Sequence, residues 1–133
     1  MRSNLLAAIT TATSTLTQFS VSQELPWDQN GQPLYRKNLK KIYVGPDRVE
    51  QTTLIALVGP GQDVYQNDRI AEVYLATDAK NPPSQLNQAI TSILSARDLT
   101  GIVNFGTESD YVVEIQEDVL VYTFEFRLNV ATT

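Results

Sequence analysis

The residue types best suited to binding chemistry are concentrated in one stretch, ELPWDQNGQPLYRKNLKK, which runs from Glu24 to Lys41. Four of the chain's ten basic residues lie in the last six positions of this stretch, and the only tryptophan lies near its start. Tryptophan, tyrosine and arginine are the side chains that most often anchor protein interfaces, and a basic segment on an acidic chain attracts acidic partners. We therefore predict an interaction site formed by Trp27, Tyr35, Arg36, Lys37, Lys40 and Lys41.

The length of this stretch also favours a function. Connections in compact domains have a median of about 4–6 residues, and connections longer than about 12–15 residues tend to be functional or disordered. Pro26, the Asn30-Gly31 pair and Pro33 interrupt any regular structure here. A solvated connector, whose cations only maintain solubility, is one alternative interpretation. A nucleic-acid-binding accessory domain is another, and it would use the basic residues of the 36–48 region, namely Arg36, Lys37, Lys40, Lys41 and Arg48.

The amino-acid composition argues against a catalytic function. The chain has no cysteine and no histidine, which excludes disulfides, thiolate sites, most zinc sites and nucleophiles activated by histidine. A carboxylate pair near the C-terminus would be needed for general acid–base chemistry, but the acids there fall at a turn and on a polar strand face, where charge is ordinary. These acids are Glu114, Glu117, Asp118 and Glu125. We therefore predict no catalytic residue, no metal site and no cofactor, and we expect a protein that is not an enzyme.

Length and charge narrow the class further. A chain of 133 residues is long enough for one hydrophobic core and too short for two, so we expect a single domain over residues 1–133. The net charge of −5 argues against a protein whose whole surface binds nucleic acid. No apolar run reaches the roughly 20 residues that a membrane span needs. Thr and Ser interrupt the opening MRSNLLAAITTATSTL, which favours an amphipathic helix over a signal peptide.

The elements that must position the basic stretch follow from hydrophobic periodicity. A first helix is predicted over about residues 3–17, because apolar residues recur there at helical spacing. The residues on its buried face are Leu5, Ile9, Ala12 and Leu16. Alternation of apolar and polar residues then predicts strands, and these are Phe19–Gln23, Lys41–Gly45, Val49–Val58 and Arg69–Ala79. The Gly and Pro content of Gly59–Asp68 predicts a loop. Because Arg69–Ala79 is apolar on both faces, we expect it to be central and to be covered on both sides by helices or a partner.

The second half of the chain predicts a helix and a hairpin. In NPPSQLNQAITSILSARD, Asn81 is the expected N-cap and Pro82 the expected first helical residue. The core-facing stripe of this helix comprises Leu86, Ala89, Ile90, Ile93 and Leu94. The hairpin extends over Tyr111–Val130, and its second strand alternates without a break, with Tyr122, Phe124 and Phe126 on one face. The element order favours an α+β fold, in which a mostly antiparallel sheet carries two helices and a long projecting loop.

In size and element order the chain resembles the tail terminator proteins of long-tailed bacteriophages, also called tail-completion or head-to-tail joining proteins. The matching patterns are MRSNLLAAI for the opening helix, KKIYVGP and VEQTTLIALV for hairpin strands, VYLATDAKNPPSQLNQAITSIL for a strand that leads into a helix, and YTFEFRLNV for the last strand. None of these patterns is diagnostic, although together they cover most of the chain. The basic stretch is longer than a minimal hairpin connection, so its role rests on composition alone.

The resemblance implies a structural function without catalysis or a cofactor. Such proteins form a hexameric ring that caps the tail tube, ends its polymerisation and presents a surface to the head connector. The implied partners are other copies of the chain, the tail tube protein and the head connector protein, with DNA only passing through the ring and no membrane involved. The implied location is the virion tail, after assembly in the host cytoplasm. Small head–tail connectors and minor tail proteins have similar sizes and share these features.

Overall fold

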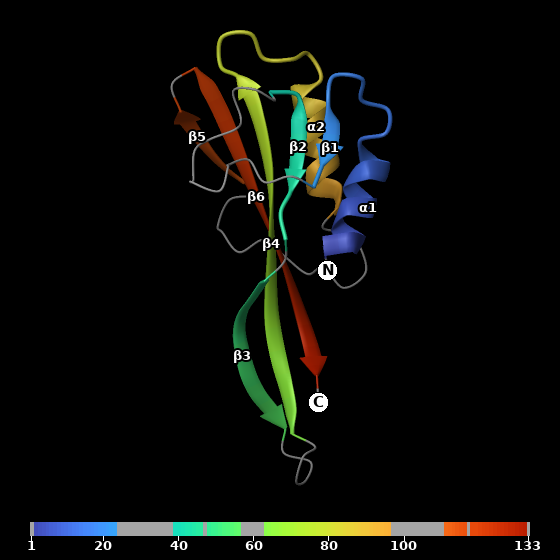
Figure 1. The fold of residues 1–133 in the computed structure, drawn as a ribbon, viewed down its shortest axis with the longest axis vertical. Coiled ribbons are helices and arrows are strands. Elements are labelled where there is room, and N and C mark those ends of the chain that lie inside the picture. The colour runs from blue at the N-terminus through green and yellow to red at the C-terminus, as the bar shows by residue number, and fades with distance from the viewer. Residues whose placement is uncertain are drawn as a thin grey trace.

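The computed structural model of the chain describes residues 2–23, 39–46, 48–56, 63–96, 111–116 and 118–132. Within these ranges two helices accompany a mixed sheet of six strands, so the predicted α+β class is confirmed. Figure 1 shows this arrangement as a ribbon. The predicted projecting loop lies outside the described residues up to position 38. The same holds for four residues of the predicted interaction site, namely Trp27, Tyr35, Arg36 and Lys37.

The elements follow one another as α1 (Arg2–Ala12), β1 (Ser20–Ser22), β2 (Lys41–Val44), β3 (Arg48–Ala56), β4 (Val64–Asp78), α2 (Leu86–Ser95), β5 (Val112–Gln116) and β6 (Val119–Thr132). The strand order across the sheet is β1-β2-β4-β6-β5, and β3 pairs with β4 separately from this path. Strand β1 joins β2 in parallel, whereas the other four pairings are antiparallel. The sheet is mixed because of this single parallel edge.

The core lies between the helices and one face of β4 and β6. Directly opposite residues in an antiparallel pair share a face, and the register places Val73 opposite Phe124 and Leu75 opposite Tyr122. These side chains pack in one cluster with Leu5 and other residues of both helices. Burial, together with the neighbouring Tyr111, raises the pKa of the Tyr122 hydroxyl. Tyr122, Phe124 and Phe126 are all buried in this cluster, so the last strand has the predicted register. We call this face of the sheet the helix side.

The opposite face of the sheet is also apolar near its centre. Tyr43, Tyr74, Ala76 and Val121 point away from the helix side by alternation, and all four are buried. The prediction that β4 is a central strand is therefore confirmed, since it lies between β2 or β3 and β6. Both described helices pack on the helix side, so of the expected cover by helices or a partner, helices account for one face among the described residues.

Helix α1 ends five residues earlier than predicted, at Ala12 rather than near residue 17. The Thr13 hydroxyl donates to the Ile9 carbonyl at 2.7 Å, and Leu16 N–H donates to the Thr13 carbonyl at 3.0 Å. Hydrogen bonds from Thr side chains to the backbone compete with continued helix, and the chain turns here. Leu16 is nevertheless buried against the core, as its place in the stripe predicts.

Helix α2 begins at Leu86, so the predicted cap at Asn81 and first helical position at Pro82 are wrong. A distant residue holds the N-cap residue in place, because the Gln18 side-chain carbonyl accepts from Gln85 N–H at 2.8 Å. The Gln85 side-chain carbonyl accepts in return from Gln18 N–H at 3.0 Å. This reciprocal pair ties the connection after α1 to the start of α2. The predicted core stripe is confirmed, with Ala89 and Ile93 buried and Leu86, Ile90 and Leu94 packed against the core.

Strand β4 is longer than predicted and begins inside the expected loop Gly59–Asp68, at Val64. Gln66, Asn67 and Asp68 have low strand preference, but β3 and β6 pair with them from both sides. Figure 1 shows that this part of the sheet continues beyond the ends of both helices. We call it the sheet extension, and it comprises β3, Val64–Ile70 of β4 and Arg127–Thr132 of β6.

Candidate interaction surfaces

The sheet extension exposes apolar side chains on its helix side. Tyr65 lies on the same face as Val73 by unbroken alternation along β4, and Leu54 is directly opposite Tyr65. Val49 is opposite Arg69, which also lies on this face. A register shift between Val49 and Gln51 brings Val49 and Leu54 to one side although they are five positions apart. All three apolar side chains are exposed because the helices end before the extension begins, and Val49 is 48% exposed.

Strand β5 forms a second exposed apolar surface at the opposite edge of the sheet. Val113 is opposite Tyr122 and Ile115 is opposite Leu120, so both lie on the helix side. Val113 is 43% exposed and Ile115 is 73% exposed. Within the described strands, β5 pairs only with β6 and β3 pairs only with β4. Exposed strand edges offer unpaired backbone groups to another strand, so the molecule presents two apolar edges on opposite sides of one sheet.

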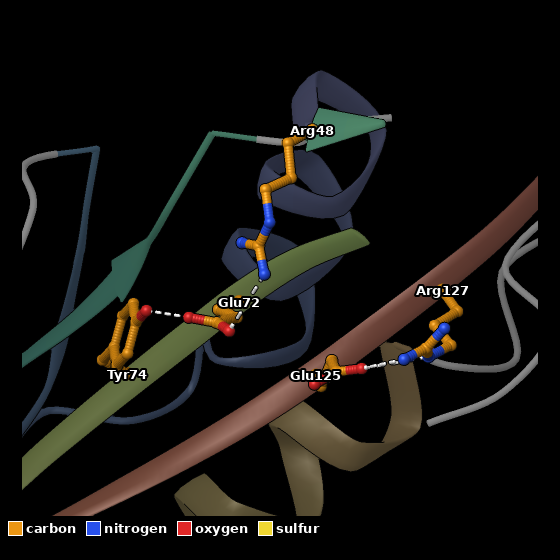
Figure 2. Close-up of polar contacts among 5 residues, drawn as sticks. All are labelled: Arg48, Glu72, Tyr74, Glu125 and Arg127. Atoms are coloured by element: carbon orange, nitrogen blue, oxygen red, sulfur yellow. Dashed lines mark hydrogen bonds and ion pairs between the residues drawn. The ribbon is translucent and has the colours of Figure 1, made fainter. Parts of the chain in front are cut away.

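A cluster of charged side chains lies on the other face of the sheet, where the extension leaves the body. Figure 2 shows its members: Arg48 from β3, Glu72 and Tyr74 from β4, and Glu125 and Arg127 from β6. Arg127 donates from Nε to Oε1 of Glu125 at 3.0 Å, and its Nη2 forms an ion pair with the same oxygen at 2.9 Å. Arg48 Nη2 lies 3.7 Å from Oε1 of Glu72, and the Tyr74 hydroxyl donates to Oε2 of the same carboxylate. We call these five residues the charged cluster.

The charged cluster compensates two carboxylates that the strand register places opposite each other. Glu72 is directly opposite Glu125, and like charges in that position destabilise a sheet. Each carboxylate is compensated by one guanidinium group, and their side chains are only 26% and 21% exposed. Two residues before Glu72, Ile70 of β4 is directly opposite Arg48 of β3 on one side and Arg127 of β6 on the other. Ile70 is buried between the two arginines. The Arg48–Glu72 pair thus joins β3 to β4 at the root of the extension, and the Arg127–Glu125 pair compensates the facing carboxylate within β6.

This arrangement predicts that Arg127→Met lowers the free energy of unfolding by about 1–2 kcal/mol. One charge-assisted hydrogen bond and one ion-pair contact are lost and Glu125 is left facing Glu72, while partial exposure reduces the effect. Methionine keeps the apolar stem beside Ile70. Chemical denaturation measures the change, and Glu125→Gln in the same chain should restore most of it. The matched control is Lys80→Met, which breaks the exposed pair with Asp118 at 3.8 Å and should change stability by less than about 0.5 kcal/mol. Equal effects of the two single variants would contradict a role for the cluster.

The described part of the predicted interaction site is the pair Lys40 and Lys41. Lys40 is exposed, and its carbonyl accepts from Ser20 N–H at 2.9 Å. Lys41 begins β2 and is half-buried. The structure brings this pair to the β1–β2 edge of the sheet, beside the end of the segment that holds the remaining site residues.

The same geometry weakens the nucleic-acid interpretation. Lys41 precedes Ile42, which is opposite Leu75, whereas Arg48 is opposite Ile70. At about 3.3 Å per residue the two cations lie about 20 Å apart along β4. Arg48 is also engaged with Glu72. Strand β2 therefore separates Lys40 from Arg48 within the 36–48 region. The charge of Arg48 is compensated by Glu72.

The carboxylates considered for catalysis are dispersed. Glu114 is exposed on β5, Asp118 is ion-paired with Lys80, and Glu125 belongs to the charged cluster. Glu117 lies outside the described residues. In the part of the chain that the structure describes, no group of three acidic residues is placed to hold a metal ion. Over the same residues, neither helix is long and apolar enough to cross a membrane.

A groove of about 440 Å³ lies between the end of α1 and α2. Its lining consists mainly of hydroxyl and amide side chains, namely Thr15, Asn87, Gln88, Thr91 and Ser92, together with Leu16. These groups can form hydrogen bonds but bring no charge or nucleophile activated by a base, so the groove offers no chemistry beyond weak polar binding.

Sequence reasoning did not find the charged cluster or the two exposed edges. One signal for the cluster was present, because Glu72 is the only charge inside the run IAEVYLA. The edges carry no such signal, since their exposure depends on where the helices end. Comparison of the sequence with models of known protein families and with curated proteins finds no match.

Proposed function

We propose that this protein is a structural component of a bacteriophage virion, a ring-forming oligomer that caps the tail tube, ends its polymerisation and joins it to the head connector. The observation that carries the proposal is the pair of exposed apolar edges on opposite sides of one sheet, β3 with Val49 and β5 with Ile115. A ring requires a heterologous contact, in which two different surfaces of each subunit meet. The molecule offers two such surfaces.

The sequence adds three supporting features. Element order and local patterns resemble the tail terminator proteins, which implies six subunits in the ring. The lack of cysteine and histidine suits a protein without catalysis or a cofactor. The finer prediction of a mostly antiparallel sheet with both helices packed on it also suits the resemblance, as four of five described pairings are antiparallel.

In this proposal the Glu24–Lys41 segment binds partners. Trp27 and Tyr35 supply buried anchors, while Arg36, Lys37, Lys40 and Lys41 meet acidic groups on a neighbouring subunit or on the tail tube protein. The head connector binds another face of the ring, DNA only passes through it, and no membrane takes part. The protein is assembled in the host cytoplasm and resides in the virion tail.

The proposal predicts discrete multiples of the chain in solution, alone or after addition of a tail tube protein. Native mass spectrometry and light scattering measure the masses, and six copies are expected from the resemblance. Tube length measured by electron microscopy should stop increasing when the protein is added. A single chain under all these conditions would contradict the proposal. If that single chain changed mass only with an oligonucleotide, and lost the oligonucleotide as salt rose, the nucleic-acid interpretation would replace it.

A further inference from the structure

We propose that the ring closes by strand addition, with the edge of β3 that no described strand covers in one copy pairing antiparallel to the corresponding edge of β5 in the next copy. This inference rests on the proposed function and names the surfaces through which copies meet. The partner is a second copy of this chain because the two edges complement each other in direction, in side-chain chemistry and in charge.

Strand directions permit this pairing between copies that are oriented alike. Strand β3 runs antiparallel to β4, while β5 is separated from β4 by two antiparallel pairings through β6. Strand β5 therefore runs in the direction of β4, and β3 runs against it. Two copies that are related by rotation, as in a ring, thus bring β3 against β5 in antiparallel orientation.

In one register, two of the three pairs of residues that the described strands bring together are complementary, and the third places Glu50 opposite Val112. When Val49 is opposite Val113, the neighbouring pair is Arg48 opposite Glu114. Val49 and Val113 both lie on the helix side and are exposed, so their contact removes apolar surface from water. Arg48 and Glu114 both lie on the other face, with Arg48 59% exposed. The joined sheet would therefore place apolar beside apolar and cation beside anion.

The strand tilt that a closed ring would have in this register can be compared with the tilt of known closed sheets. Arg48 is level with Ile70 of β4, and Glu114 is level with Val121 of β6 and hence with Ala76 of β4. The offset is 76 − 70, or six positions, which is about 20 Å at about 3.3 Å per residue. Four strand spacings separate equivalent strands of adjacent copies, or about 19 Å at about 4.8 Å each. The strands would tilt by about 45° to the ring axis, which lies at the upper end of the roughly 35–45° typical of closed sheets.

Disulfide trapping tests the register directly, because the natural chain has no cysteine. Directly opposite residues of antiparallel strands are close enough for a disulfide. A chain carrying both Val49→Cys and Val113→Cys should form, under mild oxidation, a ladder of covalent multiples up to the full ring. Each single variant should form no ladder. The matched control carries Val113→Cys with Asn4→Cys, an exposed position on α1, and should stay uncrosslinked in assembled rings.

Charge reversal provides a second test that uses intact rings. Arg48→Glu and Glu114→Arg should each lower the fraction of assembled chain about tenfold or more, because like charges then meet at every contact. An equimolar mixture of the two variants should restore rings, since alternating subunits pair opposite charges at every interface. Glu114→Arg leaves the charged cluster intact, so loss of folding does not explain its effect.

The outcomes separate this inference from the proposed function. Rings that assemble without a Val49–Val113 ladder and ignore both charge reversals would overturn the inference while the ring-forming function stands. A chain that stays single under all conditions would overturn both. A ladder together with rescue by mixing would establish the β3–β5 contact.

Discussion

Phe124→Ala lowers the free energy of unfolding by about 3–5 kcal/mol. The side chain is fully buried on the helix side, directly opposite Val73, and its ring centroid lies 5.4 Å from that of Tyr111. Truncation removes the transfer free energy of the ring and leaves a cavity that the strands on either side cannot close. Denaturant titration followed by circular dichroism measures the change in the midpoint, and the slope should remain that of the parent protein.

The matched control is Ile115→Ala, which removes apolar atoms from a strand of the same sheet. Ile115 is 73% exposed, so its truncation should change the free energy of unfolding by less than about 0.5 kcal/mol. The comparison requires a protein concentration at which the chain is single, because Ile115 lies on a proposed contact edge. Equal stability of the parent and the Phe124→Ala variant would show that the aromatic face of β6 is not the core.

Trp27→Ala weakens assembly, with tube protein or with neighbouring copies, by about 2 kcal/mol or more. Tryptophan is the residue type most enriched among interface hot spots, and Trp27 is the only one in the chain. Reversing Lys40 and Lys41 to Glu should weaken assembly as well, and more at low salt, where surface charges are least screened. Sedimentation or light scattering across a concentration series gives the assembly constant. Thermal unfolding of Trp27→Ala should match the parent, because the segment lies outside the predicted core.

The control for the charge reversal is Lys80→Glu, which changes the charge at one exposed lysine far along the chain from the segment. The Lys80 side chain forms a long 3.8 Å pair with Asp118, and both side chains are largely exposed, so assembly should stay within about twofold of the parent. If the Trp27 and lysine variants assembled and capped tubes like the parent, the segment would be a solvated connector, and the ring contact would depend on the strand edges alone.

Local periodicity determined the best sequence predictions. In β6 the aromatic residues repeat every second position, and in α2 the stripe that includes Ile93 repeats at helical spacing. Each pattern has one solution that buries its apolar face, because a slip by one residue in a strand exposes every core side chain. The α+β class follows from the order of these elements. The composition likewise excluded thiol and imidazole chemistry without any structure, because the chain has no cysteine and no histidine.

Element ends were predicted less well because distant residues decide them. Nothing near Asn81 indicates that α2 begins at Leu86, since the residue that binds the backbone N–H of its N-cap residue Gln85 is Gln18, 67 positions away. The start of α1 was predicted within a residue, whereas its end at Ala12 came five residues earlier than predicted.

Only the tertiary structure decided where the chain is exposed and which charges meet. The sequence by itself determined which residues alternate and which faces are apolar. Pairing with β3 and β6 made Gln66–Asp68 part of β4 despite their low strand preference, because both neighbours satisfy its backbone hydrogen bonds. The register shift in β3 placed Val49 beside Leu54 on one face, and the β4–β6 register placed Glu72 against Glu125. Such contacts depend on strand alignment over long sequence separations, which local periodicity does not specify.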